Sequence, residues 1–167
     1  MSTAQAPAET ASALDVQHLH TAVTIAQRSR TAGNHPFGAL LAGPDGTVLL
    51  EAENTVTTER DATGHAETNL VRLSSAAYDA EFLRTCTLYT STEPCAMCSG
   101  AIYWSHIGRV VYALGEDQLL AMTGANPENP TMALPCRDVF AAGQRVLPVV
   151  GPVAVDAART VHEGFWG

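Results

Sequence analysis

Ser91 to Gly100 read STEPCAMCSG, which places Cys95 and Cys98 three residues apart and directly after Pro94. Proline suits the first turn of a helix, and residues three apart on a helix share a face, so both thiols can reach one ion. The positive end of the helix dipole also favours their deprotonation. Taken alone, such a pair fits a zinc site or a thiol redox couple, and further ligands must decide between the two.

A second motif, DATGHAETNLV, supplies candidates for those ligands. Inside a helix, His65 and Glu67 would point about 200° apart, so both can address one site only where they straddle a helix start. The preceding residues 61–64 favour such a start. One imidazole and two thiolates, with the fourth position open to water, form the pattern of a catalytic zinc rather than a structural one. Cys86 and Cys136 lie in apolar or loop settings away from both motifs.

Length, charge and composition limit the classes of function. With 167 residues the chain fits one domain, and we expect residues 13–167 to form it, after a small, polar and disordered segment at 1–12. The formal net charge is −8, which disfavours non-specific binding of nucleic acid. No apolar run is long enough for a membrane span, and no secretion signal is evident, so we expect a cytoplasmic protein with reduced cysteines.

Apolar periodicity orders the elements as α-β-β-α-β-α-β up to residue 114. Helices are predicted at 14–31, 65–77 and 96–105, and strands at 37–42, 47–52, 85–92 and 109–114. The Gly-Pro-Asp-Gly turn at 43–46 predicts a hairpin. The signal weakens after Gly115, where TGANPENPTMALP is loop-like, and a strand at 146–150 and a helix at 153–163 are predicted beyond it. This alternation indicates an α/β fold with helices packed on a sheet.

The pairing of His65-Ala66-Glu67 with Pro94-Cys95-x-x-Cys98 is the signature of zinc-dependent nucleobase deaminases. The chain resembles the cytidine deaminase-like superfamily, in the branch of bacterial guanine deaminases and tRNA adenosine deaminases. The resemblance spans about residues 35–114 and includes PFGALL, ENTVTTERDATGHAE and TLYTSTEPCAMCSGAIYW. The VTT and IYW segments look more like guanine deaminase than like the tRNA enzyme. The resemblance implies a three-layer α-β-α fold with a central mixed sheet of about five strands.

The resemblance also assigns roles to residues of the site. It implies that His65, Cys95 and Cys98 hold Zn²⁺ and that Glu67 is the catalytic acid/base residue. It implies a substrate-binding set made of Asn54, Ala66, Trp104 and Phe37. A local backbone role is the alternative for Asn54, and a place in the core is the alternative for Trp104.

Two further polar residues lie close to these motifs. We read Glu93 as an electrostatic cap of the zinc helix. His35 is a weaker candidate for the pocket.

The expected function is hydrolytic deamination of a free purine base, with guanine converted to xanthine and ammonia. The alternatives are a tRNA adenosine deaminase, or a deaminase of cytosine, another amino-heterocycle or a nucleoside. The alternatives outside the deaminases are a zinc-stabilised binding module and a thiol redox protein that uses Cys95 and Cys98. The expected partner is a small nucleobase or nucleoside, with neither nucleic acid nor membrane. The resemblance suggests a homodimer, in which Phe165 and Trp166 would complete the neighbouring pocket.

Overall fold

A computed structural model describes residues 9–167, which are organised around one five-stranded sheet with the strand order β2-β1-β3-β4-β5. The strands are β1 (Gly38–Ala42), β2 (Val48–Glu53), β3 (Thr87–Thr92), β4 (Arg109–Leu114) and β5 (Val149–Val150). β1 pairs antiparallel with both β2 and β3, whereas β3, β4 and β5 run parallel. The predicted hairpin and the mixed sheet of about five strands are both confirmed.

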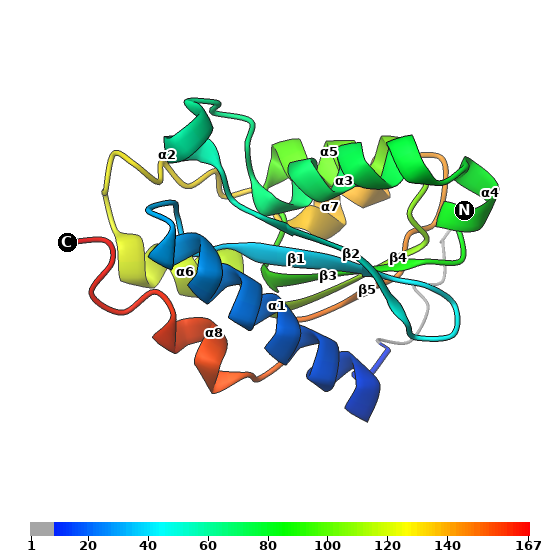
Figure 1. The fold of residues 1–167 in the computed structure, drawn as a ribbon, viewed down its shortest axis with the longest axis horizontal. Coiled ribbons are helices and arrows are strands. Elements are labelled where there is room, and N and C mark those ends of the chain that lie inside the picture. The colour runs from blue at the N-terminus through cyan, green and yellow to red at the C-terminus, as the bar shows by residue number, and fades with distance from the viewer. Residues whose placement is uncertain (1–8) are drawn as a thin grey trace.

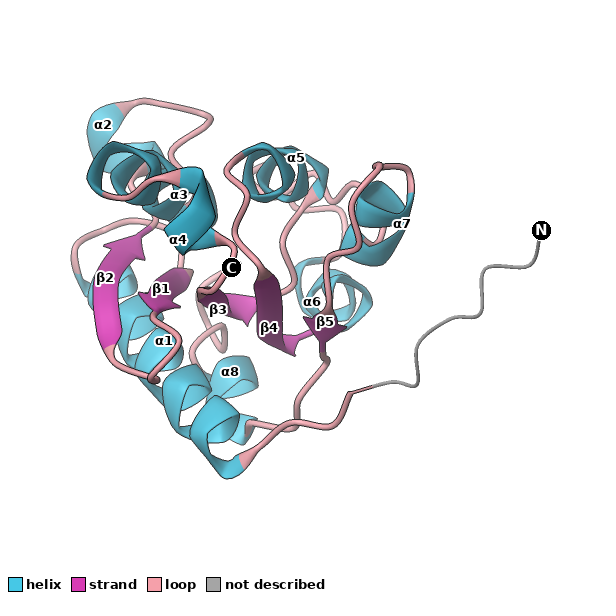
Figure 2. Cartoon of the chain, turned by 90° about the vertical axis from the view of Figure 1, so that its right-hand side faces the viewer, coloured by secondary structure: helices cyan, strands magenta, loops and turns pink. Residues whose placement is uncertain are grey.

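Helices cover both faces of this sheet, as Figures 1 and 2 show. One face carries α1 (Ala13–Thr31), α6 (Glu116–Thr123) and α8 (Asp156–Thr160). The other carries α3 (Ala66–Ala77), α5 (Ala96–Trp104) and α7 (Cys136–Ala141). Two single-turn helices, α2 (Val56–Glu59) and α4 (Ala80–Leu83), lie in the connections. The expected three-layer α-β-α arrangement is therefore confirmed.

The central strands are buried on both faces, which explains why they read as continuous apolar runs rather than as alternating patterns. On β1, Leu40 packs into the cluster under α1, whereas Ala39 and Leu41 pack into the cluster under α3 and α5. Gly38 begins this strand, and a Cβ atom there would collide with the backbone of α1 at Ala22. The glycine thus lets the first helix lie directly against the sheet.

The carboxyl ends of β3 and β4 meet at one edge of the sheet, where Thr92 lies opposite Leu114. α5 begins just after β3 and α6 just after β4, so both helices start at this edge. In open α/β sheets ligands bind outside the carboxyl ends of the strands. The fold therefore directs attention to the residues that follow Thr92 and Leu114.

The segment after Gly115 differs most from the sequence-based expectation. It contains α6 and α7, which were not predicted, on either side of the loop-like stretch. β5 has only two residues of the predicted 146–150, and α8 is shorter than the predicted 153–163. The guanidinium of Arg137 donates to the carbonyls of Val149 and Gly151, so a side chain outside the sheet holds this short strand.

The start of the described chain is also more ordered than predicted. Of the segment 1–12, residues 1–8 lie outside the described part, but Glu9, Ala11 and Ser12 have defined contacts. Ser12 caps α1 in a capping box with Asp15, and the carboxylate of Glu9 lies 3.2 Å from the Arg109 guanidinium. Across residues 9–167, every helix is too short or too polar to cross a bilayer.

Candidate metal centre

Two helix starts converge to build the site. His65 is the N-cap residue of α3 and Cys95 the N-cap residue of α5, both with extended backbone, and neither side chain caps its own helix. Their side chains are thus free to bind something else. Cys98 and Glu67 follow in the first turns of the two helices. The predicted geometry, in which His65 and Glu67 straddle a helix start, is what the structure shows.

The loop before His65 is held by side chains of its own neighbourhood. The carboxylate of Asp61 accepts from the backbone N–H and the hydroxyl of Thr63, which closes a tight turn. From the next turn of α3, the Asn69 amide donates to the Glu53 carbonyl and to Thr55 Oγ1, at 2.9 and 3.0 Å. α3 therefore fixes the loop that positions its own N-cap imidazole.

Three candidate ligands lie at the spacing that zinc requires. His65 Nδ1 is 3.6 Å from Cys95 Sγ and 3.5 Å from Cys98 Sγ, and the three atoms all lie within 4.8 Å of one another. Tetrahedral zinc with Zn–N near 2.0–2.1 Å and Zn–S near 2.3 Å separates nitrogen from sulfur by about 3.6 Å. Within residues 9–167 no fourth His, Cys or carboxylate joins this group. The donor set therefore fits a zinc ion with one position left for a small molecule.

The electrostatics of the two thiols also favour a cation. A hydrogen bond from Cys98, followed by one from His65, outweighs burial and lowers the pKa of the Cys95 thiol to about 4. Its hydrogen bond to Cys95, together with burial, raises the pKa of the Cys98 thiol. One thiolate therefore forms readily, whereas the second needs a positive charge beside it.

Glu67 lies beside the ligands with its side chain only 4% exposed. Its Oε1 is 2.7 Å from the Thr90 hydroxyl, and burial raises the pKa of its carboxyl group. Thr90 Oγ1 is also 3.0 Å from the Thr92 carbonyl, but the hydroxyl has a single proton. When Glu67 is ionised, Thr90 can donate to it, and when Glu67 is protonated, Thr90 can accept and donate to Thr92 instead. Both protonation states of Glu67 can thus be hydrogen-bonded.

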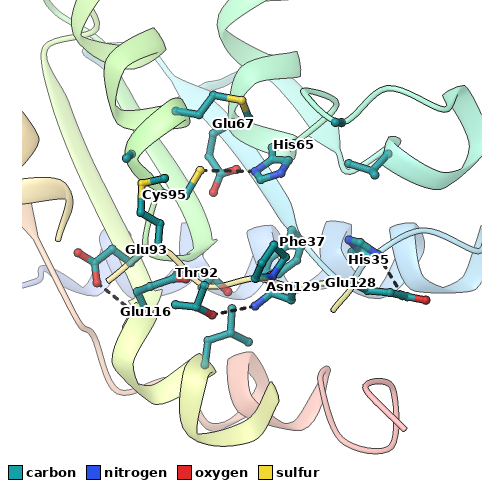
Figure 3. Close-up of a pocket in the computed structure, with 18 residues that line it drawn as sticks. His35, Phe37, His65, Glu67, Thr92, Glu93, Cys95, Glu116, Glu128 and Asn129 are labelled. Atoms are coloured by element: carbon teal, nitrogen blue, oxygen red, sulfur yellow. Dashed lines mark hydrogen bonds and ion pairs between the residues drawn. The ribbon is translucent and has the colours of Figure 1, made fainter. Parts of the chain in front are cut away.

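A cavity of about 340 Å³ opens onto these groups, as Figure 3 shows. It is lined by His35, Phe37, Val56, Ala62, His65, Glu67, Thr92, Glu93, Cys95, Ala96, Met97, Glu116, Leu119, Glu128, Asn129, Pro130, Thr131 and Met132. Four carboxylates and no arginine belong to this lining, although all nine basic residues of the chain are arginines. The cavity is therefore suited to a ligand without negative charge.

Two of these carboxylates lie at the start of α6. Glu93 accepts from the backbone N–H of Glu116 and from that of Cys136, both at 3.0 Å, so it caps α6 and α7. The expectation that it caps the zinc helix α5 is therefore corrected. Burial, with the negative charges of Cys95, Glu93 and Glu67, raises the pKa of Glu116 to about 7.

The residues predicted to bind substrate lie at different places. Phe37 lines the cavity. Asn54 is buried outside the lining and accepts from the Val56 N–H at 3.1 Å, which is the local role given as its alternative. Ala66 is buried in the core. Its backbone N–H lies in the first turn of α3, and the N–H groups of a first turn have no acceptor within their own helix. For these three residues, contact with substrate remains a prediction.

Trp104 does not wall the cavity of its own chain. It is 79% exposed, its ring packs edge-on against Tyr103, and it is absent from the cavity lining. The reason is helical geometry, because nine residues after Cys95 make two and a half turns and place the side chain on the opposite face. The core position considered as the alternative is excluded as well.

Several other residues that line the cavity were weak candidates, or no candidates, for the site on the sequence alone. His35 lines the cavity, with its Nε2 at 3.5 Å from Glu128 of the loop between α6 and α7. The same loop contributes residues 128–132. A loop rich in proline and asparagine shows that the chain turns, but its sequence does not say which surface it meets.

The C-terminal aromatic residues pack against His35, on the side of the cavity lining, in the same chain. The rings of Phe165 and Trp166 have centroids 5.9 and 5.3 Å from that of His35. The Arg30 guanidinium donates to the carbonyls of Val161 and Glu163 and so holds the segment against α1. The suggestion that these aromatic residues complete a partner's pocket is not needed to explain their packing.

Comparisons with known proteins agree with this geometry. The model of the zinc-binding region of cytidine and deoxycytidylate deaminases matches residues 12–114. A probable cytosine deaminase of Schizosaccharomyces pombe is 41% identical over 152 residues, which are 91% of this chain and 92% of that protein. The guanine deaminase of Bacillus subtilis is 46% identical over 96 residues, 57% of this chain and 61% of that one.

A solved guanine deaminase from Nitrosomonas europaea has a TM-score of 0.71 at 25% identity, covering 95% of this chain and 86% of that one. Residues 12–114, which the family model matches, contain all three candidate zinc ligands and Glu67. On the fold, the ligand geometry and these matches, the chain belongs to the cytidine and deoxycytidylate deaminase family of zinc-binding proteins.

Proposed function

We propose that residues 13–167 act as a single zinc-dependent domain that hydrolyses a free amino-substituted nucleobase, with guanine giving xanthine and ammonia as the leading reaction. The observation that carries this proposal is a buried carboxyl group, Glu67, beside a three-ligand metal site at the base of a 340 Å³ cavity. The likeness to guanine deaminases in sequence and in fold supports the choice of guanine.

In this mechanism His65, Cys95 and Cys98 would hold Zn²⁺, which would supply a Lewis acid able to lower the pKa of a water molecule to about 7. Glu67 takes one proton from the attacking water and delivers it to a ring nitrogen of the base. The carboxylate that results then takes the second proton from the new hydroxyl group on the attacked carbon and passes it to the amine, which leaves as ammonia while the carbonyl forms. Because addition and elimination occur at one carbon, one carboxyl group can serve both transfers, which typically contribute about 10²–10⁴-fold.

Cytosine is the second candidate substrate. The relative named as a probable cytosine deaminase matches almost the whole chain, including the part after Leu114 that supplies Glu116 and Glu128 to the cavity. A tRNA substrate fits less well, because phosphates need cations and the cavity lining has four carboxylates and no arginine.

The test is ammonia release by the zinc-loaded protein from guanine, cytosine, adenine and their nucleosides. We expect turnover of a free base, and Glu67→Gln should lower kcat at least 100-fold while one zinc per chain is retained. Glu81→Gln, an exposed carboxylate on α4, is the matched control and should leave kcat unchanged. Loss of zinc from the Glu67→Gln protein would show that Glu67 is a zinc ligand. If the wild type released ammonia from none of these compounds, the proposed deaminase activity would be refuted.

We also propose a cytoplasmic homodimer. All four cysteines are unpaired, which suits a reducing compartment. Two large apolar side chains on the helix layer of α3 and α5 are exposed, Leu73 at 48% and Trp104 at 79%, and we assign them to the surface that a second copy would cover. Sedimentation should give twice the 17.6 kDa chain mass, and Trp104→Ser should shift it toward monomer. A monomeric wild-type protein at micromolar concentration would contradict the dimer.

A further inference from the structure

Glu116 stands out among the carboxylates of the cavity because its oxygens have no partner in the described part of the chain. Both oxygens of Glu93 accept backbone N–H groups, Glu67 is bonded to Thr90, and Glu128 lies beside His35. The Glu116 side chain makes no hydrogen bond or ion pair with any residue between 9 and 167, although it is half-buried. A half-buried carboxyl group is costly unless it meets a hydrogen-bonding partner.

The backbone places Glu116 where a ligand can reach it. It follows β4 directly, at the edge where Thr92 ends β3, and its own N–H is held by Glu93. A second cavity, of about 310 Å³, shares Glu93, Glu116 and Thr131 with the first, so Glu116 lies at the junction of the two. In Figure 3, Glu116 and Thr92 lie below the cavity, whereas His65 and Glu67 lie above it.

Thr92 is an independent indication that the part of the cavity lining near Glu116 binds a polar ligand. It lines the same cavity, is 2% exposed, and its hydroxyl oxygen makes no hydrogen bond within the described residues. Buried hydroxyl groups are normally satisfied in folded proteins. Two polar side chains without partners, on neighbouring strand ends of one cavity wall, indicate a surface that hydrogen-bonds to something bound there.

We propose that Glu116 is a specificity-determining residue whose carboxylate accepts the ring N–H that a free nucleobase carries where a nucleoside carries its sugar. This inference rests on the proposed function. In guanine and in cytosine that N–H is remote from the amine-bearing carbon, so a base with its amine at the metal presents it to the far wall. A nucleoside lacks this donor, which leaves the carboxylate unpaired and lowers affinity.

A purely local role must be distinguished from this one. Glu116 is the first residue of α6, where a negative charge stabilises the helix dipole. Asp117 shares that first turn, is exposed, and lines only the second cavity. Asp117→Asn therefore removes an equivalent charge from the helix end without touching the first cavity, and it is the matched control.

The test compares guanine with 9-methylguanine, and cytosine with 1-methylcytosine, because methylation removes only the ring N–H. Turnover is measured with zinc-loaded wild type, Glu116→Gln and Asp117→Asn. Dissociation constants are measured by calorimetry in the Glu67→Gln background, which does not consume the ligand. We expect Glu116→Gln to weaken binding of the free base about tenfold or more and to leave the methylated base unaffected. Asp117→Asn should match the wild type for both ligands.

Equal effects on free and methylated bases, or none, would overturn the role of Glu116. If the wild type deaminates a base and Glu116→Gln does so equally well, the inference fails and the proposed function stands. If no base is turned over but the calorimetric difference is present, the proposed function fails and Glu116 still reads the N–H. Absence of binding by any base overturns both. Tighter binding of guanosine than of guanine would assign the carboxylate to the sugar instead.

Discussion

The hydroxyl of Thr90 is the contact that decides how Glu67 holds its proton. Glu67 is buried, so its charge is not stabilised by solvent. Its side-chain partners are the Thr90 hydroxyl at 2.7 Å and the Cys98 thiol at 3.6 Å, and only the hydroxyl stays available as a donor when Cys98 binds a metal as a thiolate. Because Thr90 can also donate to the Thr92 carbonyl, it can serve the carboxylate and the carboxylic acid in turn. A residue that must give and take protons in one cycle benefits from such a neighbour.

Thr90→Val removes this hydroxyl while nearly preserving side-chain volume. We expect kcat to fall about tenfold, since one hydrogen bond to a charged group is lost, and we expect zinc content to be unchanged. Thr90→Ser should restore kcat because it returns the hydroxyl. Steady-state kinetics on the best substrate and metal analysis measure both. A Thr90→Val protein with wild-type kcat, or a Thr90→Ser protein as slow as the valine variant, would contradict the positioning role.

The spacing of residues predicts contacts only where one helix fixes the geometry. Cys95 and Cys98 could be placed together because a helix start sets their separation, whatever the rest of the chain does. The same rule, applied to Trp104, shows why its place in the pocket was wrong. Glu116 gave no comparable signal, because its neighbours come from β3 and α5, and their proximity depends on the register of two parallel strands.

At the scale of elements, the metal site joins α3 to α5 at their starts. His65 comes from one helix and the two thiols from the other, so a bound ion cross-links two neighbouring elements of one layer. Ion binding to the folded state alone adds to the free energy of unfolding. The site is therefore expected to support the fold as well as the chemistry.

Cys98→Ser should abolish stoichiometric zinc binding and lower the melting temperature by several degrees, because a hydroxyl is a poor zinc ligand and the cross-link is lost. Cys136→Ser is the control, since Cys136 is an equally buried thiol outside the site. It should keep one zinc per chain, as measured by elemental analysis. Full zinc content in the Cys98→Ser protein would remove Cys98 from the ligand set.

Periodicity located the long elements and missed the short ones for a physical reason. α1 and α3 have 19 and 12 residues and bury a long face, which imposes a repeat on the sequence. α6 and α7 have eight and six residues, and their starts are held by the carboxylate of Glu93 from β3's end of the sheet. A helix that is stabilised by a distant cap leaves little trace in its own sequence.

At the scale of the molecule, one buried cluster ties the α1 layer to the sheet. The carboxylate of Asp15 on α1 accepts from the Tyr89 hydroxyl at 2.7 Å and from two nitrogens of Arg109 at 2.8 and 3.0 Å. These side chains come from β3 and β4, so a single carboxylate connects three elements. Although burial alone would raise it, the bonds from Arg109, Ser12 and Tyr89 hold the pKa of Asp15 well below its usual range.

This lowered pKa sets the direction of the pH dependence. A carboxyl group whose pKa is depressed by folding stabilises the folded state above its unfolded pKa, near 3.9, and loses that contribution as the pH falls through its folded value. Asp15→Asn should therefore lower the free energy of unfolding by about 2–4 kcal/mol at pH 7, because the partly buried Arg109 guanidinium then keeps only the exposed carboxylate of Glu9 as its partner. Below about pH 4 the difference from the wild type should shrink.

Urea unfolding of the two proteins at pH 7, 5 and 3 measures this difference, and taking the difference removes the pH dependence that both share through their metal site. Asp156→Asn, at an exposed carboxylate on α8, should track the wild type at each pH. If Asp15→Asn instead differs from the wild type by the same amount at pH 7 and pH 3, the stabilisation does not depend on the charge of Asp15. The cluster would then join the layers by shape and neutral hydrogen bonds alone.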